Sequence, residues 1–135
     1  MDFVYKIDTP ANTYTAENPL ITVARLTRGR LAGGFVYFPS GPAGNLHFCA
    51  RMAVHQILPF GPGQSYALDD CVIPIYFAID FPEPPYEIDL VTWNTSTLYS
   101  HSLTVGIFLE PLNKRKWQLS TAIDALNPVK GYRKP

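Results

Sequence analysis

Hydrophobic and polar residues alternate along several short stretches of the chain. Two stretches show this most clearly: residues 46, 48, 50, 52 and 54, and residues 103, 105, 107 and 109, are apolar on one parity. Because successive side chains of a β-strand point to opposite faces, such alternation predicts strands with one buried face, as in antiparallel sheets. Eight stretches are predicted to be strands: Phe3–Ile7, Leu20–Thr27, Gly34–Phe38, Leu46–Val54, His55–Leu58, Cys71–Ile79, Tyr86–Trp93 and Leu98–Leu109.

Prolines and glycines separate these stretches. The chain has 13 Pro and 9 Gly, and many of them fall in residues 39–45, 59–63 and 81–85. These residue types favour tight turns, and none of the connections is long enough to hold a crossover helix, which disfavours a parallel sheet. The pattern therefore predicts an all-β fold, an antiparallel β-sandwich or jelly roll of about eight strands.

The beginning of the chain departs from this pattern. Residues 8–18 are polar and show no periodicity. We therefore expect Phe3–Ile7 to be either an outlying strand or part of an extended arm that reaches a neighbouring subunit. In the second case Phe3, Val4 and Tyr5 are the candidate assembly residues of the arm.

The end of the chain differs in another way. After Pro111, three apolar residues at positions 119, 123 and 126 have helical spacing, which predicts a short amphipathic helix or tail. Trp117, which follows the basic run at residues 114–116, is a further candidate for assembly contacts. The expected organisation is an N-terminal arm over residues 1–18, a β-sandwich domain over residues 19–111 and a C-terminal helix or tail over residues 112–135.

Composition adds one unusual feature, a shortage of charge. A chain of 135 residues is long enough for one domain with a real core. Charged residues are 16% of the chain, against roughly 25% in typical soluble domains, while aromatic residues are 13%. Either neighbouring molecules cover part of the surface, or Ser, Thr, Asn and Pro keep it hydrated; both interpretations stay open.

The net charge of zero argues against a nucleic-acid partner, because no broad positive field would attract phosphates. The chain also has no signal peptide pattern at its start and no apolar run of membrane-spanning length, so we expect synthesis in the cytoplasm and no membrane partner. Cys49 and Cys71 fall on different parities of their predicted strands, which predicts free thiols.

Candidate metal ligands and catalytic groups do not form a recognised pattern. His47, Cys49 and His55 share one parity, but Arg51 lies between them and no CxxC or HExxH motif is present. A calcium site at Asp69 and Asp70 would need more oxygen ligands than the loop supplies. No nucleophile-elbow sequence occurs. We therefore expect neither enzymatic activity nor a cofactor or metal.

One cluster could bind a ligand. Trp93, Asn94, Tyr99 and His101 surround a single predicted turn, and aromatic rings beside an amide are typical of carbohydrate sites. The competing interpretation is that Trp93 and Tyr99 close the open end of the core.

Three segments carry a resemblance to a known class of protein. Residues 35–44 end a strand in a Pro-Gly loop, residues 55–59 close a strand on Gln and Pro, and residues 85–101 run through Trp93 and Asn94 to a last hairpin. This order resembles small β-sandwich proteins encoded among the virion genes of phages and archaeal viruses, over roughly Leu20 to Pro111.

The resemblance implies a function in assembly. It implies a capsid decoration or minor virion protein, present in the virion, that forms a symmetric homo-oligomer, with a trimer favoured, and binds a capsid or other virion protein. The alternative is a carbohydrate-binding module with a glycan ligand at Trp93 and Tyr99.

Overall fold

The computed structural model describes residues 1–112, which contain eight strands. Their bounds are β1 (Asp2–Thr9), β2 (Leu20–Arg25), β3 (Gly29–Phe38), β4 (Leu46–Met52), β5 (His55–Leu58), β6 (Cys71–Phe81), β7 (Glu87–Asn94) and β8 (His101–Glu110). Every predicted strand is present, with ends shifted by a few residues. The helix expected near residues 118–126, and Trp117, lie outside the described residues.

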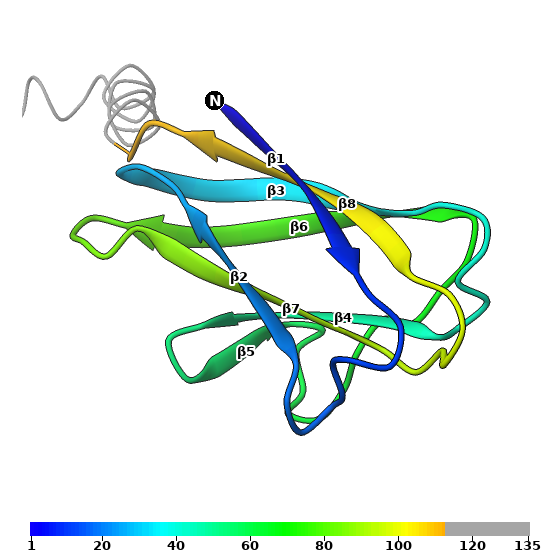
Figure 1. Cartoon of the computed structure of the whole chain (residues 1–135). Helices are drawn as coiled ribbons and strands as arrows, with labels where there is room; N and C mark the ends of the chain where they lie inside the picture. The colour runs from blue at the N-terminus through cyan, green and yellow to red at the C-terminus, as the bar shows by residue number, and fades with distance from the viewer. Residues whose placement is uncertain (113–135) are drawn as a thin grey trace, which may run out of the picture.

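The strands form two four-stranded antiparallel sheets that pack as a sandwich (Figure 1). Sheet A has the order β1-β8-β3-β6 and sheet B the order β2-β7-β4-β5. The pairs β1·β8, β2·β7, β3·β6 and β4·β5 are those of one long hairpin rolled up on itself. This strand order is that of a jelly roll, which confirms the predicted all-β sandwich and selects its topology.

The core lies between the two sheets and uses the apolar parity of each central strand. Its largest fully buried side chains include Phe38 and Leu31 from sheet A and Phe48, Leu46 and Leu90 from sheet B. Burial of these side chains is the main stabilising contribution, because apolar burial yields about 25 cal/mol for each Å² removed from water.

Strand β1 corrects the expectation of an N-terminal arm over residues 1–18. Residues 2–9 pair with β8 along their whole length, from Asp2 opposite Phe108 to Thr9 opposite His101. Ile7 and Thr9 are buried, and the Thr9 hydroxyl donates a hydrogen bond of 2.9 Å to the hydroxyl of Thr92 in sheet B. The first strand therefore belongs to the sandwich, because its alternate residues face the core. It lies at one edge of sheet A.

The two cysteines are free, as predicted. Cys71 begins β6, while Cys49 lies on the outer parity of β4, opposite Val91 of β7. Although Cys49 shares the outer parity with His47 and Arg51, it is only 1% exposed. Arg51 hydrogen-bonds the thiol; burial nevertheless raises the pKa of Cys49, with the Arg51 charge acting in the opposite direction. Cys49 is thus a buried neutral thiol beneath a charged neighbour.

Candidate functional site

The outer face of sheet A is unusually apolar for a surface in contact with water. Five large side chains on it are exposed: Tyr76 (86%), Val4 (62%), Val72 (57%), Tyr37 (39%) and Phe108 (39%). Together with Phe35 they are called here the aromatic face. The strand register brings them together, because Val4, Gly106, Phe35 and Pro74 form one row across the sheet, and Lys6, Thr104, Tyr37 and Val72 form the next.

Gly106 shapes the aromatic face. Phe35 lies flat over Gly106, since a Cβ at Gly106 would overlap the Phe35 ring. The same ring is tilted by 53° against that of Phe108, with 6.2 Å between centroids, a favourable aromatic arrangement. Phe35 therefore packs on its own sheet, against Gly106 and Phe108.

Charges border the aromatic face at one end. Arg30 forms an ion pair of 2.8 Å with Asp80 and one of 3.7 Å with Glu110, and these three residues form one cross-strand row. Asp2 and Lys6 lie on the β1 side. The row through Phe35, by contrast, carries no charged residue, so a partner could cover that row without leaving an unpaired charge.

The predicted ligand cluster does not converge. Trp93 lies on the outer parity of β7, where its ring is stacked on that of His47 with 5.1 Å between centroids and 6° between planes. Asn94 points to the opposite side and is 4% exposed. Tyr99 is 67% exposed in the loop before β8, and His101 pairs with Thr9 at the start of β8. Trp93 is thus engaged with His47 on the outer face of sheet B, and Asn94 faces the interior.

Asn94 has a structural task. Its amide nitrogen donates hydrogen bonds to the carbonyl oxygens of Thr9 (3.1 Å) and Tyr99 (2.9 Å), and its side-chain oxygen accepts one from the Ser96 amide (2.9 Å). These bonds join β1, the turn after β7 and the segment leading into β8. Because three of its hydrogen-bonding positions are already used, Asn94 is not placed to recognise a ligand.

His47, Cys49 and His55 are not brought together either. His47 accepts or donates one hydrogen bond of 2.9 Å between Nδ1 and the Ser65 hydroxyl, and burial lowers the pKa of its imidazole, which favours the neutral ring at neutral pH. Cys49 is buried beside Arg51. His55 lies in β5 at the edge of sheet B. No group of three metal-ligating side chains occurs within residues 1–112.

Asp69, considered above as a calcium ligand, is bound to the backbone instead. Its Oδ1 accepts hydrogen bonds from the amides of Gly41 (2.8 Å) and Ala43 (2.9 Å). These bonds, first that of Ala43 and then that of Gly41, lower the pKa of the carboxyl group, and the charge of His101 acts in the same direction. Asp69 thus fastens the loop between β5 and β6 to the loop between β3 and β4.

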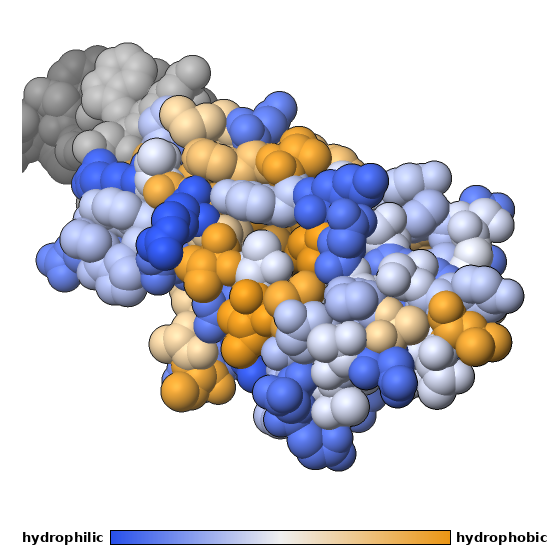
Figure 2. Space-filling model, viewed as in Figure 1, coloured by the Kyte–Doolittle hydropathy of each residue, from blue (hydrophilic) through white to orange (hydrophobic). Residues whose placement is uncertain are grey.

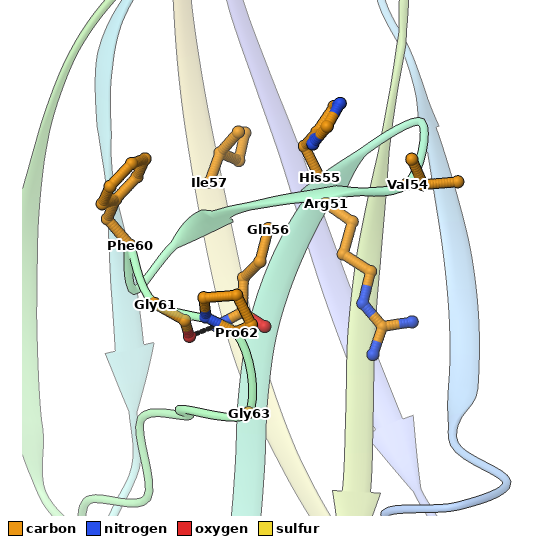
Figure 3. Close-up of a pocket in the computed structure, with 9 residues that line it drawn as sticks. All are labelled: Arg51, Val54, His55, Gln56, Ile57, Phe60, Gly61, Pro62 and Gly63. Carbon is orange, nitrogen blue, oxygen red and sulfur yellow. Dashed lines mark hydrogen bonds between the residues drawn. The ribbon is translucent and has the colours of Figure 1, made fainter.

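A pocket of about 530 Å³ lies beside β5, at the edge of sheet B. It is lined by Arg51 and residues 54–57 and 60–63. Figure 3 shows Phe60, Ile57 and His55 on one side of β5 and Gln56 on the other. The Gln56 amide nitrogen lies 2.8–2.9 Å from the carbonyl oxygens of Pro59, Gly61 and Gln64, so it shapes the loop. Phe60 is 92% exposed at the rim, and the polar groups of the pocket do not converge on one point.

The candidate assembly residues near the start of the chain divide between core and surface. Phe3 and Tyr5 pack against the core, while Val4 belongs to the aromatic face. Sequence reasoning missed this face as a site, although two signals pointed to it: the shortage of charge, and the presence of apolar residues on both parities of β6.

The part of the chain that the structure describes has no helix with the length and hydrophobicity to cross a membrane. No protein-family model, curated protein or solved structure matches the chain.

Proposed function

We propose that this chain is a structural protein of a virus particle, a capsid decoration or minor virion protein that binds copies of itself and a larger protein shell. The observation that carries the proposal is the aromatic face of sheet A. Jelly rolls are common in viral capsid proteins and also occur in lectins and cupins. The fold alone therefore does not separate these classes of protein, and the properties of the surface have to.

The size of the aromatic face supports a protein partner. A whole aromatic side chain has a surface of about 150–250 Å². With the exposed fractions given above, the five exposed side chains of the aromatic face together present about 500 Å² to solvent. A standard interface covers about 800 Å² on each partner, and about two thirds of a homo-oligomer interface is apolar. The face therefore has the area of the apolar centre of one such interface.

The chemistry of the face also suits assembly better than catalysis or sugar binding. Tyr37 and Tyr76 combine a large apolar ring with a hydroxyl, the side-chain type enriched at protein interfaces. Ion pairs of Arg30 at one end supply a polar rim. A glycan site would need amides or carboxylates beside its rings, whereas the Trp93 ring is stacked on His47 and the neighbouring Asn94 amide is buried.

The first test asks where the protein is found. Particles produced by the virus that encodes this chain are purified and analysed by mass spectrometry, with the major shell protein as reference. We expect the chain at a constant ratio to the shell protein after washing in high salt, because apolar contacts resist salt. Particles that lack the chain would overturn the proposal.

The second test asks whether the aromatic face makes the contact. The variants Val72→Asp and Tyr76→Asp place a charge at exposed positions, so the fold should survive, while binding to shells stripped of the wild-type chain should fall at least tenfold. Val54→Asp, at a position 86% exposed in the β4–β5 turn, is the matched control and should bind as wild type. Equal binding by all variants, or glycan binding by a monomer, would contradict the proposal.

A further inference from the structure

Within residues 1–112, the edge of β2 is a second surface that no other strand covers, separate from the aromatic face. Strand β2 pairs only with β7 among the described strands, and Figure 1 shows it on the side of the sandwich that faces the viewer. An edge strand leaves the amide and carbonyl groups of every second residue free to pair with another strand.

Two hydrogen bonds show which groups of β2 are free. The amide of Leu26 donates to the Tyr86 carbonyl, so even-numbered residues turn their backbone groups toward β7. The carbonyl of Arg25 accepts a hydrogen bond of 3.2 Å from the Tyr5 hydroxyl, which lies on the other side. Because the amide and carbonyl of one strand residue point the same way, Ile21 and Val23 present donors and acceptors at the edge that no group within residues 1–112 pairs.

The other three edges of the sandwich are protected against strand addition, within the part of the chain that is described. Strand β1 carries Asp2, Lys6 and Asp8, strand β6 has Pro74 in its middle, and β5 has only four residues. Charges, prolines and short length are the usual means of blocking an edge. In β2, residues 20–24 have neither charge nor proline.

Side chains of the same two residues make the edge apolar. Ile21 is 49% exposed and Val23 is 37% exposed on the outer parity of sheet B, and Ile21 lies opposite the buried Val91. Figure 2 shows hydrophobic side chains gathered over β2. A strand added at this edge would gain both backbone hydrogen bonds and apolar contacts.

We propose that β2 pairs antiparallel with β2 of a second copy of this chain, around a two-fold axis at Thr22. Ile21 of each copy then lies opposite Val23 of the other, and their free amides and carbonyls form four hydrogen bonds across the axis. The inference rests on the proposed assembly function and names the contact between copies. It gives a dimer, in place of the trimer that the resemblance favoured, because the interface uses the same strand twice.

Tyr5 disfavours the alternative register centred on Val23. A shift that placed Val23 opposite Val23 would bring Arg25 opposite Ile21, and the Arg25 carbonyl is already engaged by the Tyr5 hydroxyl. In the proposed register Arg25 lies at the end of the paired segment, where its ion pair of 2.6 Å with Glu87 stays undisturbed. The two sheets B then form one continuous sheet of eight strands.

Mass measurement tests whether the contact exists. Light scattering of the purified full chain should give twice the mass of one chain, whereas Val23→Lys should give a monomer, or a dimer at least tenfold weaker, with an unchanged circular dichroism spectrum. Val54→Lys makes the same change at a valine outside β2 and should remain a dimer. A monomeric wild-type protein, or a Val23→Lys variant that dimerises as wild type, would overturn the inference.

Crosslinking tests the register. In a background of Cys49→Ala and Cys71→Ser, Thr22→Cys should form an intermolecular disulfide on mild oxidation, because residues 22 face each other at about 4.5 Å between Cα atoms. Val23→Cys should not, since its Cα atoms would be about 8 Å apart. Thr97→Cys, in an exposed turn, is the control for random collision. Crosslinking through Val23→Cys alone would overturn the register.

These outcomes are separate from those of the proposed function. Purified protein that dimerises through β2 but is absent from particles would contradict the virion assignment and leave the edge contact standing. Particles that contain the chain as single copies would support the virion assignment and contradict the β2 contact.

Discussion

At the scale of single residues, the interior of this protein depends on a few polar side chains that join its two sheets. Thr9 and Thr92 are fully buried and hydrogen-bonded to each other across the sandwich. Asn94 adds bonds to Thr9 and to the turn that follows β7. Buried polar groups are costly when unpaired, so each of these residues makes the correct pairing of the sheets more favourable than its alternatives.

The first residue-scale prediction concerns Asn94. Asn94→Ala should lower the free energy of unfolding by about 1–3 kcal/mol, because the Thr9 and Tyr99 carbonyls and the Ser96 amide lose their partner in a buried or partly buried place. Urea denaturation followed by fluorescence measures the change. Thr97→Ala, at an exposed position of the same turn, is the control and should shift stability by less than about 0.5 kcal/mol. Equal effects of the two substitutions would contradict this role.

At the scale of elements, loops far apart in the sequence are held together by single side chains. Asp69 accepts hydrogen bonds from the amides of Gly41 and Ala43. These bonds join the loop after β5 to the loop after β3. The Asp69 pKa is lowered in the folded state by these bonds. A carboxyl group with a lowered folded pKa stabilises the fold above its unfolded pKa, near 3.9, and this contribution is lost as pH falls through the folded pKa.

That linkage predicts a pH-dependent effect of Asp69→Asn. The variant should be less stable than wild type at pH 6–7, where the carboxylate is ionised and accepts both amides, and the difference should shrink below about pH 3 as the wild-type carboxyl takes up a proton. Urea midpoints measured across this range provide the test. Asp70→Asn is the matched control at the neighbouring position. A difference that stays constant from pH 7 to pH 2 would show that ionisation of Asp69 is not involved.

The interpretation of strand β1 depends on its pairing with β8. The amino end looked like an arm because the polar residues 8–18 follow it without periodicity. In the structure those residues are mainly the connection from β1 to β2, and the strand itself completes sheet A beside β8. Residues 1–9 therefore contribute to folding as well as to the aromatic face, through Val4.

At the scale of the whole molecule, two apolar surfaces lie on different sheets. The aromatic face belongs to sheet A and the β2 edge to sheet B. An assembly protein that binds both itself and a shell needs two such surfaces, because one contact cannot serve both partners at once. If both surfaces are covered in an assembly, they account for the low share of charged residues in the chain, 16%.

This arrangement predicts that the two contacts can be removed independently. Val23→Lys should abolish dimerisation and retain binding of each copy to stripped shells, though with lower avidity. Tyr76→Asp should do the opposite, leaving the dimer intact and weakening shell binding. Light scattering and co-sedimentation with shells measure the two properties on the same preparations. Loss of both properties in either single variant would indicate one shared surface instead.

The sequence by itself determined the elements of this protein. Period-two alternation and the spacing of Pro and Gly are local signals, and they located all eight strands and separated Cys49 from Cys71 in strand parity. Of the candidate ligand cluster, the structure joins Asn94 to Tyr99 through a backbone carbonyl, and to Thr9, the strand partner of His101.

Only the tertiary structure decided what those elements do. Strand order depends on pairings between distant segments, such as β1 with β8, that local patterns do not encode. Where both parities of a strand are apolar, as in β6, alternation does not tell which side meets the core; the sheet opposite does. The arrangement of the two sheets produces the aromatic face and the exposed edge of β2. It also buries Asn94 and Cys49.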